Sequence, residues 1–523
     1  MSLPKLSGKQ MEILYLRDDK NLLIKGSAGS GKSLLIMYRA IWLAKKHKDK
    51  KILLLTYNRA VNKKIMLDIE LICNDLKIGI PDNLEIKTYH TFCLRKLRNI
   101  LPEIGTEHIS SYNIDIKKLS YTDKRKTIIQ NILEKLKKED PDNKTYQRPI
   151  FVFEDEISWI QRMNVRSLEE YIAAERIGRQ SVRITRSDRP YFFKVYDGYK
   201  NELKNTQSED IYDYEDIGDI LKDSYSILRE SKTHYFSDLY DYILVDEFQD
   251  FSINMLASLQ SAKKDGGVIS LFGDVKQNIF GKRVSMKRLG ITDFATYNIE
   301  QNFRNSKEIS LYVSRIAESP FLNKKDEFYV KTNISDRITN DPPSIMKFTS
   351  KYNELKWIVN YIKDNTSQEI AILTNAKSIK FIKNTLLKNN IEFETTQSKY
   401  EKYSNNKKVI VATIKQVKGL EFETVILPFQ SIEEYVEMIN YNSEQGEIDT
   451  NILKLSCNKS EESLAQEDDQ GLNETPNEIN ITNKLEEYIS EIYVSVSRAK
   501  NKLIITYSNE LFPLYPGATK LGE

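Results

Sequence analysis

Short apolar runs alternate with longer helical patterns in two separate parts of the chain. In the first part, the apolar runs cover residues 22–24, 52–55, 84–88, 242–245 and 268–272. In the second part, they cover residues 345–348, 370–373, 409–412, 425–427 and 503–505. Strands that alternate with helices predict parallel sheets, in which functional residues lie at the carboxyl ends of the strands. We therefore predict an α/β protein with two parallel-sheet domains.

The first series of strands is interrupted by a long stretch of different character. Residues 101–225 consist of long helical segments rich in Lys and Glu, which favour a helical insertion. The predicted organisation is a first α/β domain made of residues 1–100 and 226–290, this insertion, and a second α/β domain at 291–523. Within the second domain, residues 435–482 are rich in Asn, Ser and acidic side chains, which predicts a solvated and partly disordered loop.

Composition narrows the class of protein more than its function. The 523 residues are 40% apolar and 29% charged, which is typical of a soluble globular chain. The net charge of +3 is nearly balanced, so any nucleic-acid surface must come from local clustering of charge. Cys73, Cys93 and Cys457 show no disulfide or metal-binding spacing, and no apolar run reaches the roughly 18 residues of a membrane span. These features predict a cytoplasmic protein without membrane association.

One segment fits the pattern Gly-x-x-x-x-Gly-Lys-Ser between an apolar run and a helical pattern. It comprises Gly26, Ser27, Ala28, Gly29, Ser30, Gly31, Lys32 and Ser33. In such a phosphate loop the glycines let the backbone curl, so that successive N–H groups point at phosphate oxygens. Lys32 then reaches the β- and γ-phosphates, and the Ser33 hydroxyl ligates Mg²⁺. The segment predicts a nucleotide site, and a Gly-rich turn without a ligand is the alternative.

Two acids follow the strand predicted at residues 242–245. Asp246 can hold the Mg²⁺ shell opposite Ser33, and Glu247 can orient and deprotonate the attacking water. Acid pairs after strands also cap helices, which is the alternative for this pair taken alone. Together with the phosphate loop, the pair predicts nucleotide hydrolysis.

These segments, in this order, resemble superfamily 1A DNA helicases of the UvrD/Rep/PcrA type. Besides the phosphate loop, the similarity is carried by Gln10, by residues 55–60, 88–92, 246–250, 273–277 and 301–304, by Thr413 with residues 418–422, and by residues 493–500. The resemblance covers most of the chain. It implies two RecA-like domains of the P-loop nucleotide hydrolase class, a helical insertion of the family's 1B type in the first, and ATP with Mg²⁺ as cofactors.

The resemblance also implies residues that bind the nucleotide base and sugar. Gln10 would read the adenine, and Phe303 would stack on one face of it. Arg39 would lie on the opposite face of the adenine, and Glu421 would approach the ribose.

Further residues are implied in coupling hydrolysis to domain movement. Gln277 would sense the γ-phosphate. Arg304 and Arg498, from the second domain, would neutralise transition-state charge only when the two domains close. Loss of the γ-phosphate would then let the domains separate, a hinge cycle that can step along a strand. Buried arginines paired with structural acids are the alternative for both.

The resemblance is weaker evidence for the nucleic-acid track, which needs aromatic platforms and polar groups along one groove. Its candidate residues are Tyr57, Asn58, His90, Thr91, Phe92, Phe280 and Thr413. For Phe92, which follows a strand, a place in the core is the alternative. A second candidate is a stripe that shares one face of a continuous helix, formed by Arg176, Arg179, Arg183, Arg186 and Arg189. An ordinary solvated helix face is the alternative for that stripe.

Three features depart from the family pattern. Phe280 is followed by Gly281 where the family has a second stacking aromatic residue, and Lys415 stands at a position that is normally histidine. Positions 304 and 413 are 109 apart, which leaves room for the second sheet but not for the large 2B subdomain of full-size relatives. This compact form retains the ATPase and the strand track, but it weakens the case for duplex unwinding.

Two function hypotheses follow. The first is an ATP-dependent helicase or translocase that moves 3′→5′ on single-stranded or tailed duplex DNA, in repair, recombination or antiphage defence. The second is a DNA-stimulated ATPase that acts as a sensor or regulatory subunit for a partner, such as a nuclease or other effector, in bacterial defence. The acidic loop at 435–482 could engage such a partner.

Overall fold

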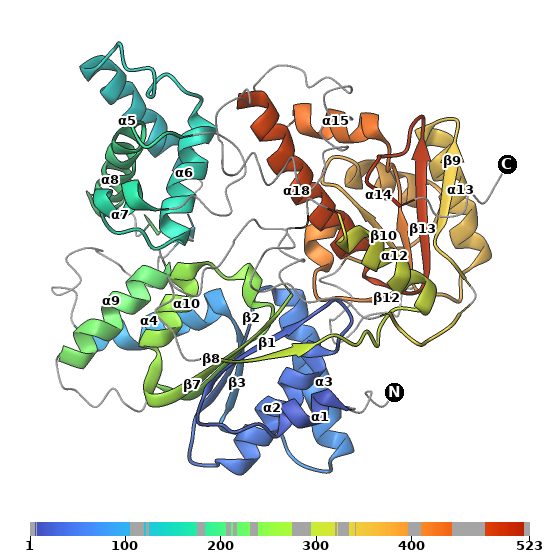
Figure 1. Ribbon diagram of the computed structural model, residues 1–523, viewed down its shortest axis with the longest axis horizontal. Coiled ribbons are helices and arrows are strands. Elements are labelled where there is room, and N and C mark those ends of the chain that lie inside the picture. The colour runs from blue at the N-terminus through green and yellow to red at the C-terminus, as the bar shows by residue number, and fades with distance from the viewer. Residues whose placement is uncertain are drawn as a thin grey trace.

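Two α/β domains and a separate group of helices make up the protein (Figure 1). The computed structural model describes residues 6, 8–104, 120–121, 125–174, 184–205, 211–212, 217–230, 239–274, 294–319, 322, 334–339, 341–395, 409–441 and 476–516. In this part of the chain, no helix combines the length and the apolar character that crossing a membrane requires.

The first domain is built on a parallel sheet of six strands in the order β3-β2-β6-β7-β1-β8. Its strands are β1 (Asn21–Gly26), β2 (Ile52–Thr56), β3 (Leu84–Thr88), β6 (Tyr240–Val245), β7 (Lys263–Gly273) and β8 (Phe294–Ile299). Its helices are α1 (Lys9–Leu14), α2 (Lys32–Lys46), α3 (Arg59–Asp75), α4 (Tyr89–Ile104), α9 (Ile217–Glu230), the 3₁₀ turn η2 (Phe248–Asp250) and α10 (Ile253–Ser261). Since all neighbouring strands are parallel, the segments that follow β1, β6 and β7 meet at one edge of the sheet.

The second domain is built on a parallel sheet of five strands in the order β11-β10-β12-β13-β9. Its strands are β9 (Ser344–Phe348), β10 (Ile370–Thr374), β11 (Val409–Thr413), β12 (Phe422–Leu427) and β13 (Ala499–Ser508). Its helices are α12 (Lys307–Ala317), α13 (Lys351–Asp364), α14 (Ile379–Lys388), the 3₁₀ turn η5 (Ile414–Val417), α15 (Ile432–Tyr441) and α18 (Pro476–Val496). The prediction of two parallel-sheet α/β domains is therefore confirmed.

The helical insertion contains α5 (Arg125–Glu139), α6 (Ile150–Arg162), α7 (Leu168–Ala173) and α8 (Arg189–Asn205). Two short strands, β4 (Ser120–Tyr121) and β5 (Ile211–Tyr212), pair with each other in parallel. The next helix, α9, packs instead against α4 and α10 of the first domain, and Figure 1 shows these three helices together below the insertion.

The first sheet extends beyond the boundary predicted at residue 290. Strand β8 pairs with β1 in parallel register from Asn21 opposite Phe294 to Gly26 opposite Ile299. It is an edge strand in which only the last residue is fully buried, so it lacks the continuous apolar run that marked the other strands. The chain therefore leaves the first sheet after Ile299, directly before the segment that contains Arg304.

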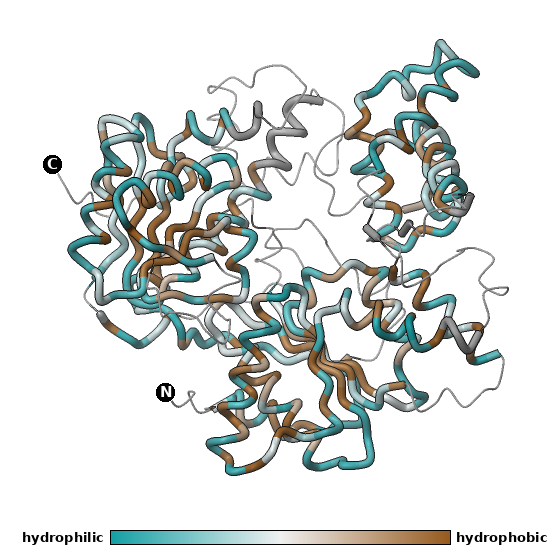
Figure 2. The backbone as a smooth tube through the Cα atoms, turned by 180° about the vertical axis from the view of Figure 1, so that it is seen from behind, coloured by the Kyte–Doolittle hydropathy of each residue, from teal (hydrophilic) through white to brown (hydrophobic). Residues whose placement is uncertain are grey.

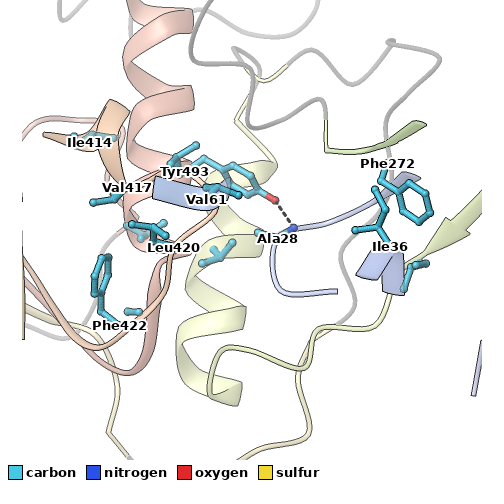
Figure 3. Close-up of a cluster of buried hydrophobic side chains, with 14 of the residues drawn as sticks. Ala28, Ile36, Val61, Phe272, Ile414, Val417, Leu420, Phe422 and Tyr493 are labelled. Atoms are coloured by element: carbon cyan, nitrogen blue, oxygen red, sulfur yellow. Dashed lines mark hydrogen bonds between the residues drawn. The ribbon is translucent and has the colours of Figure 1, made fainter. Parts of the chain in front are cut away.

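The strands form the apolar interior of both α/β domains, as the brown segments of Figure 2 show. One cluster of buried side chains continues from the first domain into the second. Figure 3 shows this cluster where the two domains meet, with Val61 of α3 beside Val417 and Leu420 of the second domain. The two domains are thus packed against each other through buried side chains.

Candidate functional site

The phosphate loop joins the end of β1 to the start of α2, as the sequence predicts. Gly29 and Gly31 have φ values of 78° and 77°, in the left-handed region that favours glycine. The Lys32 ammonium group is buried and donates to the carbonyl oxygens of Gly26 at 2.8 Å and Ser27 at 2.9 Å. The loop is therefore closed around the lysine that the sequence assigns to phosphate binding.

Asp246 lies beside Ser33, although the two residues are far apart in the sequence. The Ser33 hydroxyl donates to Asp246 Oδ2 at 3.0 Å, because β6 and β1 end at the same edge of the first sheet. Burial raises the pKa of Asp246 to about 7, and the neighbouring charge of Glu247 acts in the same direction. A bound cation would favour the ionised carboxylate and would release any proton that Asp246 carries.

Glu247 is held in a strained position by its neighbours. Its φ is 52°, and the Gln249 amide donates to its Oε2 at 2.6 Å. The Gln249 Oε1 in turn accepts from the backbone N–H of Asp274 at 3.0 Å. Burial acts to raise the pKa of Glu247, but the charges of Lys32 and Lys418 outweigh it and lower the pKa. The result is a charged carboxylate at neutral pH, which is the form that a general base needs.

Gln249 and Asp274 both lie in segments that marked the family resemblance, but sequence reasoning gave neither residue a role. Only the contact between the ends of β6 and β7 shows that they orient Glu247.

Arg304 reaches the same site from the segment that follows β8. A Cβ atom built on Gly29 would lie 2.9 Å from the Arg304 Cβ, so the two backbones approach closely. The Arg304 Nε donates to Glu421 Oε2 at 2.8 Å. Burial of Glu421 acts to raise its pKa, but the charges of Arg304 and Lys500 hold that pKa at about 2. Arg304 is therefore an ion-pair partner of Glu421 and also a neighbour of the phosphate loop.

Arg498 is buried between the end of α18 and the start of β13. Its guanidinium donates to the backbone carbonyls of Val494 at 3.0 Å and Leu420 at 3.1 Å, and to the Ser497 hydroxyl at 2.9 Å. Burial lowers its pKa to about 9, with the positive charge of Arg304 acting in the same direction, while the charge of Glu247 opposes it. The charge of Glu247 therefore acts on Arg498, and the charge of Arg304 acts on Lys32, where it helps burial to lower the pKa of that lysine.

Unpartnered polar atoms test whether this site fits a nucleoside triphosphate. The Ser27 hydroxyl, the Ser30 hydroxyl and Arg304 Nη1 are buried and have no hydrogen-bond partner among the described residues. Such groups are costly unless a ligand satisfies them, and phosphate oxygens accept hydrogen bonds from all three types. The described residues contain no cluster of three or more His, Cys, Asp or Glu that could hold a metal ion. Ser33 and Asp246 together fit Mg²⁺, which takes one or two protein ligands beside phosphates and water.

The other predicted nucleotide contacts differ in where they lie. Gln10 is at the phosphate loop, where its Nε2 donates to the Ser30 carbonyl at 2.9 Å. Phe303 is 41% exposed, and its backbone N–H donates to the Gly29 carbonyl at 2.9 Å. Arg39 is buried and donates to the carbonyls at the end of α1, including Leu14 at 2.8 Å, so its observed contacts are structural. The adenine and ribose roles of Gln10, Phe303, Arg39 and Glu421 stay predictions.

Several predicted nucleic-acid contacts lie in the first domain at the starts of α3 and α4. Asn58 caps α3 by accepting from the Val61 N–H at 2.7 Å, and it donates to the Lys418 carbonyl at 3.4 Å. Tyr57 and His90 are partly buried, and the Thr91 side chain is exposed and accepts from the Thr88 hydroxyl at 2.8 Å. Thr413 ends β11 in the second domain and is partly buried. Gln277 and Phe280 lie outside the described residues.

Phe92 is a correction to the predicted track. It is fully buried and packs edge-to-face on Tyr240, with ring centroids 6.0 Å apart. A ring enclosed in the core offers no face to a base, so the alternative interpretation is the correct one for this residue.

The arginine stripe in the insertion is a second correction. Residues 184–188 lie outside any helix, and α8 begins only at Arg189, so Arg186 and Arg189 do not share a continuous helical face. Arg189 is buried and donates to the carbonyls of Tyr171, Ile172 and Ala174 at 2.6–2.9 Å. Arg176, Arg179 and Arg183 lie outside the described residues.

Contacts across the domain interface were not foreseen from the sequence. The Lys418 ammonium group forms a buried ion pair with Asp250, which directly follows Gln249 in the acidic segment. The Tyr493 hydroxyl donates to Asp274 Oδ2 at 3.2 Å and accepts from the Ala28 N–H at 3.5 Å, the contact drawn in Figure 3. Both residues lie in segments that resemble the family motifs, but only their tertiary partners show that they join the two domains.

Lys415, which departs from the family pattern, is paired within the second domain. Its ammonium group lies 2.9 Å from Glu487 Oε1 and 3.5 Å from Glu491 Oε1 of α18.

Comparison with known proteins places the chain among helicases. Residues 6–290 match the model of the UvrD/REP helicase N-terminal domain, and residues 396–510 match that of the UvrD-like helicase C-terminal domain. The chain is similar to the ATP-dependent DNA helicase PcrA of Staphylococcus epidermidis, 24% identical over 389 residues, which cover 71% of this chain and 48% of that protein. A probable DNA helicase II homolog of Mycoplasma capricolum is 24% identical over 375 residues, covering 69% of this chain and 47% of the homolog.

A shorter similarity concerns the exonuclease/helicase subunit RexA of Lactococcus lactis. It is 27% identical over 163 residues, which cover 27% of this chain and 13% of that subunit. The chain spans about half the length of the PcrA and helicase II relatives it matches.

Proposed function

Because the chain belongs to the UvrD/REP helicase family, we propose that it is an ATP-dependent DNA helicase or translocase. It would couple hydrolysis of Mg²⁺-ATP to 3′→5′ movement along single-stranded DNA. The similar proteins named as DNA helicases support DNA as the substrate class.

One observation carries the proposal. The first domain carries Lys32, Ser33, Asp246 and Glu247. Two arginines approach them from the part of the chain that follows β8, the last strand of the first domain: Arg304 and Arg498. A nucleotide site divided in this way has all of its positively charged side chains around the phosphates only when the two domains are closed. Hydrolysis at such a site can therefore report and drive domain movement.

Each residue then has a chemical task. The nucleotide supplies the phosphoanhydride bond to be cleaved, and its magnesium ion neutralises phosphate charge. Lys32 would exchange its carbonyl partners for phosphate oxygens, and Ser33 and Asp246 would hold the cation. Glu247, held by Gln249, would accept a proton from the attacking water. Arg304 and Arg498 would neutralise charge that develops on the transferred phosphoryl group.

Movement on DNA would follow from alternate gripping by the two domains. Asn58 in the first domain and Thr413 in the second are predicted contacts, and Asn58 touches the Lys418 carbonyl of the second domain. A change in domain spacing would therefore alter the distance between two strand-binding segments, as a stepping mechanism requires.

A second candidate function is a sensor or regulatory subunit for a partner effector. Between residues 305 and 412 every described helix and strand belongs to the second α/β domain, and no further subdomain is present among them. The similarity to a protein named as an exonuclease/helicase subunit supports a nuclease as partner. DNA repair, recombination and antiphage defence are the proposed settings for either function.

Parallel assays separate the two functions. The isolated protein is given ATP with a single strand, and separately with a duplex carrying a 3′ tail. Unwinding of the tailed duplex together with DNA-stimulated ATP hydrolysis supports the helicase. Strong stimulation of hydrolysis with neither unwinding nor movement along the single strand supports the sensor, and absence of ATP hydrolysis under all conditions contradicts both.

A further inference from the structure

Two buried asparagines, Asn302 and Asn305, flank Arg304. The Asn302 Oδ1 accepts from the backbone N–H groups of Arg304 at 3.0 Å and Asn305 at 3.2 Å. The Asn302 Nδ2 donates to Asn305 Oδ1 at 2.9 Å, so the two amides are bonded to each other. Both side chains are at most 2% exposed. A buried and satisfied network of this kind fixes one conformation of the backbone that carries Arg304.

Asn305 extends this network to the other arginine. Its Nδ2 donates to the backbone carbonyls of Ser497 at 3.2 Å and Ala499 at 2.5 Å, which are the residues on either side of Arg498. Arg337 adds a second link, because its Nη2 donates to the carbonyls of Arg304 at 3.0 Å and Lys500 at 2.5 Å. The segments that carry Arg304 and Arg498 are therefore held together by the side chains of Asn305 and Arg337.

Asn302 also lies against the phosphate loop. A Cβ atom built on Gly29 would lie 2.4 Å from Asn302 Oδ1, and the Phe303 N–H donates to the Gly29 carbonyl at 2.9 Å. A shift of the loop at Gly29 toward Asn302 would therefore displace Asn302, because no free space separates them. Asn302 would pass that movement to Arg304 and, through Asn305, to the segment of Arg498.

We propose that Asn302 and Asn305 are positioning residues that join the phosphate loop, Arg304 and Arg498 into one mechanical unit. Both arginines would then move together, toward the phosphate loop when the loop binds a nucleotide and away from it when the nucleotide is released. The inference rests on the proposed ATP hydrolysis, and it assigns to these amides a task beyond that of holding the fold.

The test replaces Asn305 by residues that cannot donate to the two carbonyls. Asn305→Ala removes the amide. Asn305→Asp keeps the shape of the side chain, but it replaces the donor with a carboxylate oxygen, which the carbonyl oxygens of Ser497 and Ala499 repel. The matched control is Asn389→Asp in the same domain, since the Asn389 Nδ2 also donates to a backbone carbonyl, that of Thr385 at 2.9 Å. Thermal melting and the affinity for ADP establish that each variant is folded and retains the nucleotide site.

We expect both Asn305 variants to lower kcat for DNA-stimulated ATP hydrolysis by roughly 10- to 100-fold, because misplaced catalytic groups are costly. The affinity for ADP should change by less than about twofold, since the residues of the phosphate loop are untouched. Asn389→Asp should leave kcat within about twofold of the parent protein.

The decisive measurement repeats Asn305→Ala in an Arg304→Ala background. If Asn305 acts through the arginines, the second substitution should lower kcat by much less than it does in the parent protein, because the effects are not additive. Equal losses in both backgrounds, or no loss in the parent protein, would overturn the inference. A parent protein without ATPase activity would instead refute the proposed function, so the two failures are distinguishable.

Discussion

At the scale of single residues, burial and neighbouring charges together set the pKa of each ionisable group. Asp246 and Glu247 are adjacent in the chain, but their pKa values shift in opposite directions. Burial raises that of Asp246 to about 7, whereas the charges of Lys32 and Lys418 overcome burial and lower that of Glu247. Only the second carboxylate is fully prepared to accept a proton before the cation binds.

Glu247→Gln should therefore abolish turnover and retain the nucleotide. Loss of a general base lowers the rate of hydrolysis by about 10²- to 10⁴-fold, while the amide keeps the shape of the side chain. Single-turnover hydrolysis and ATP affinity measure the two effects. Lys32→Ala is the contrasting variant, since it should weaken ATP binding as well as abolish hydrolysis. Turnover that survives in Glu247→Gln would remove Glu247 from its assigned role.

Glu354 gives the second domain a dependence on pH. It is fully buried on α13, and its Oε1 accepts from the Phe429 N–H at 2.5 Å and the Thr506 hydroxyl at 2.6 Å. Its other oxygen has no hydrogen-bond partner among the described residues. Burial raises its pKa from 4.5 to about 7, although the two hydrogen bonds act in the opposite direction.

The folded state holds the proton of Glu354 more tightly than the unfolded state. The contribution of Glu354 to the free energy of unfolding is therefore fully present below pH 4.5 and is lost as the pH rises through about 7. The loss amounts to about 3 kcal/mol for one buried group. Glu354→Gln keeps the accepting oxygen and cannot ionise, so it should flatten this part of the stability profile. Denaturant unfolding at pH 5, 6 and 7 measures the slope. The exposed Glu318→Gln is the control, and an unchanged slope in Glu354→Gln would contradict the prediction.

At the scale of elements, the phosphate loop is shaped by what packs on it as much as by its own sequence. Gly29 has a left-handed backbone and faces Asn302 and Arg304. Gly266 in β7 has a similar φ of 74°, but a Cβ atom built there would meet nothing within 4 Å. A comparison of the two glycines therefore separates the cost of backbone conformation from the cost of contact with the segment that carries Arg304.

Gly29→Ala should lower ATP hydrolysis much more than Gly266→Ala. Both substitutions carry the strain of a left-handed alanine, about 1–2 kcal/mol. Only the alanine at position 29 would push against Asn302 and displace Arg304. Steady-state ATPase assays, with melting temperatures as a measure of strain, compare the two. Equal activity in both variants would show that the contact has no part in hydrolysis.

At the scale of the whole molecule, the closed arrangement depends on a few buried contacts between the domains. The Lys418–Asp250 ion pair is 2% and 3% exposed. A Cβ atom on Gly419, the next residue, would lie 2.7 Å from a methyl group of Val61 on α3. Tyr493 adds its hydrogen bond to Asp274. The loop that carries Lys418 thus fits closely onto the first domain.

Lys418→Met should open the molecule. Removing one partner of a buried ion pair leaves an uncompensated charge that costs about 3–5 kcal/mol. Separation of the domains lets water solvate Asp250, so the radius of gyration from small-angle X-ray scattering should increase. The double variant Lys418→Met with Asp250→Asn should recover much of the closed form. Lys502→Met breaks an exposed pair with Asp341 at 3.5 Å and is the control. A radius unchanged from the parent protein in the single variant would contradict the prediction.

The sequence by itself determined the two parallel-sheet domains and the identity of the phosphate loop and its acidic partner. Apolar periodicity reports burial along single elements, and parallel strands bring their carboxyl ends to one edge, so Ser33 and Asp246 could be paired without coordinates. Strand β8 was missed because it is a half-exposed edge strand, and its sequence therefore lacks an apolar pattern.

Only the tertiary structure decided which side chains are enclosed and which segments meet across domains. Phe92 and Arg189 lie in stretches that resemble binding surfaces, but both are buried against other elements, Phe92 against Tyr240 of β6 and Arg189 against the carbonyls in and after α7. Asn305 and Lys418 bind partners more than a hundred residues away in the sequence. Asn302 binds Asn305 within one loop, whose conformation brings the two amides together. Such contacts depend on how whole elements pack, and a local pattern of polar and apolar residues carries no record of that packing.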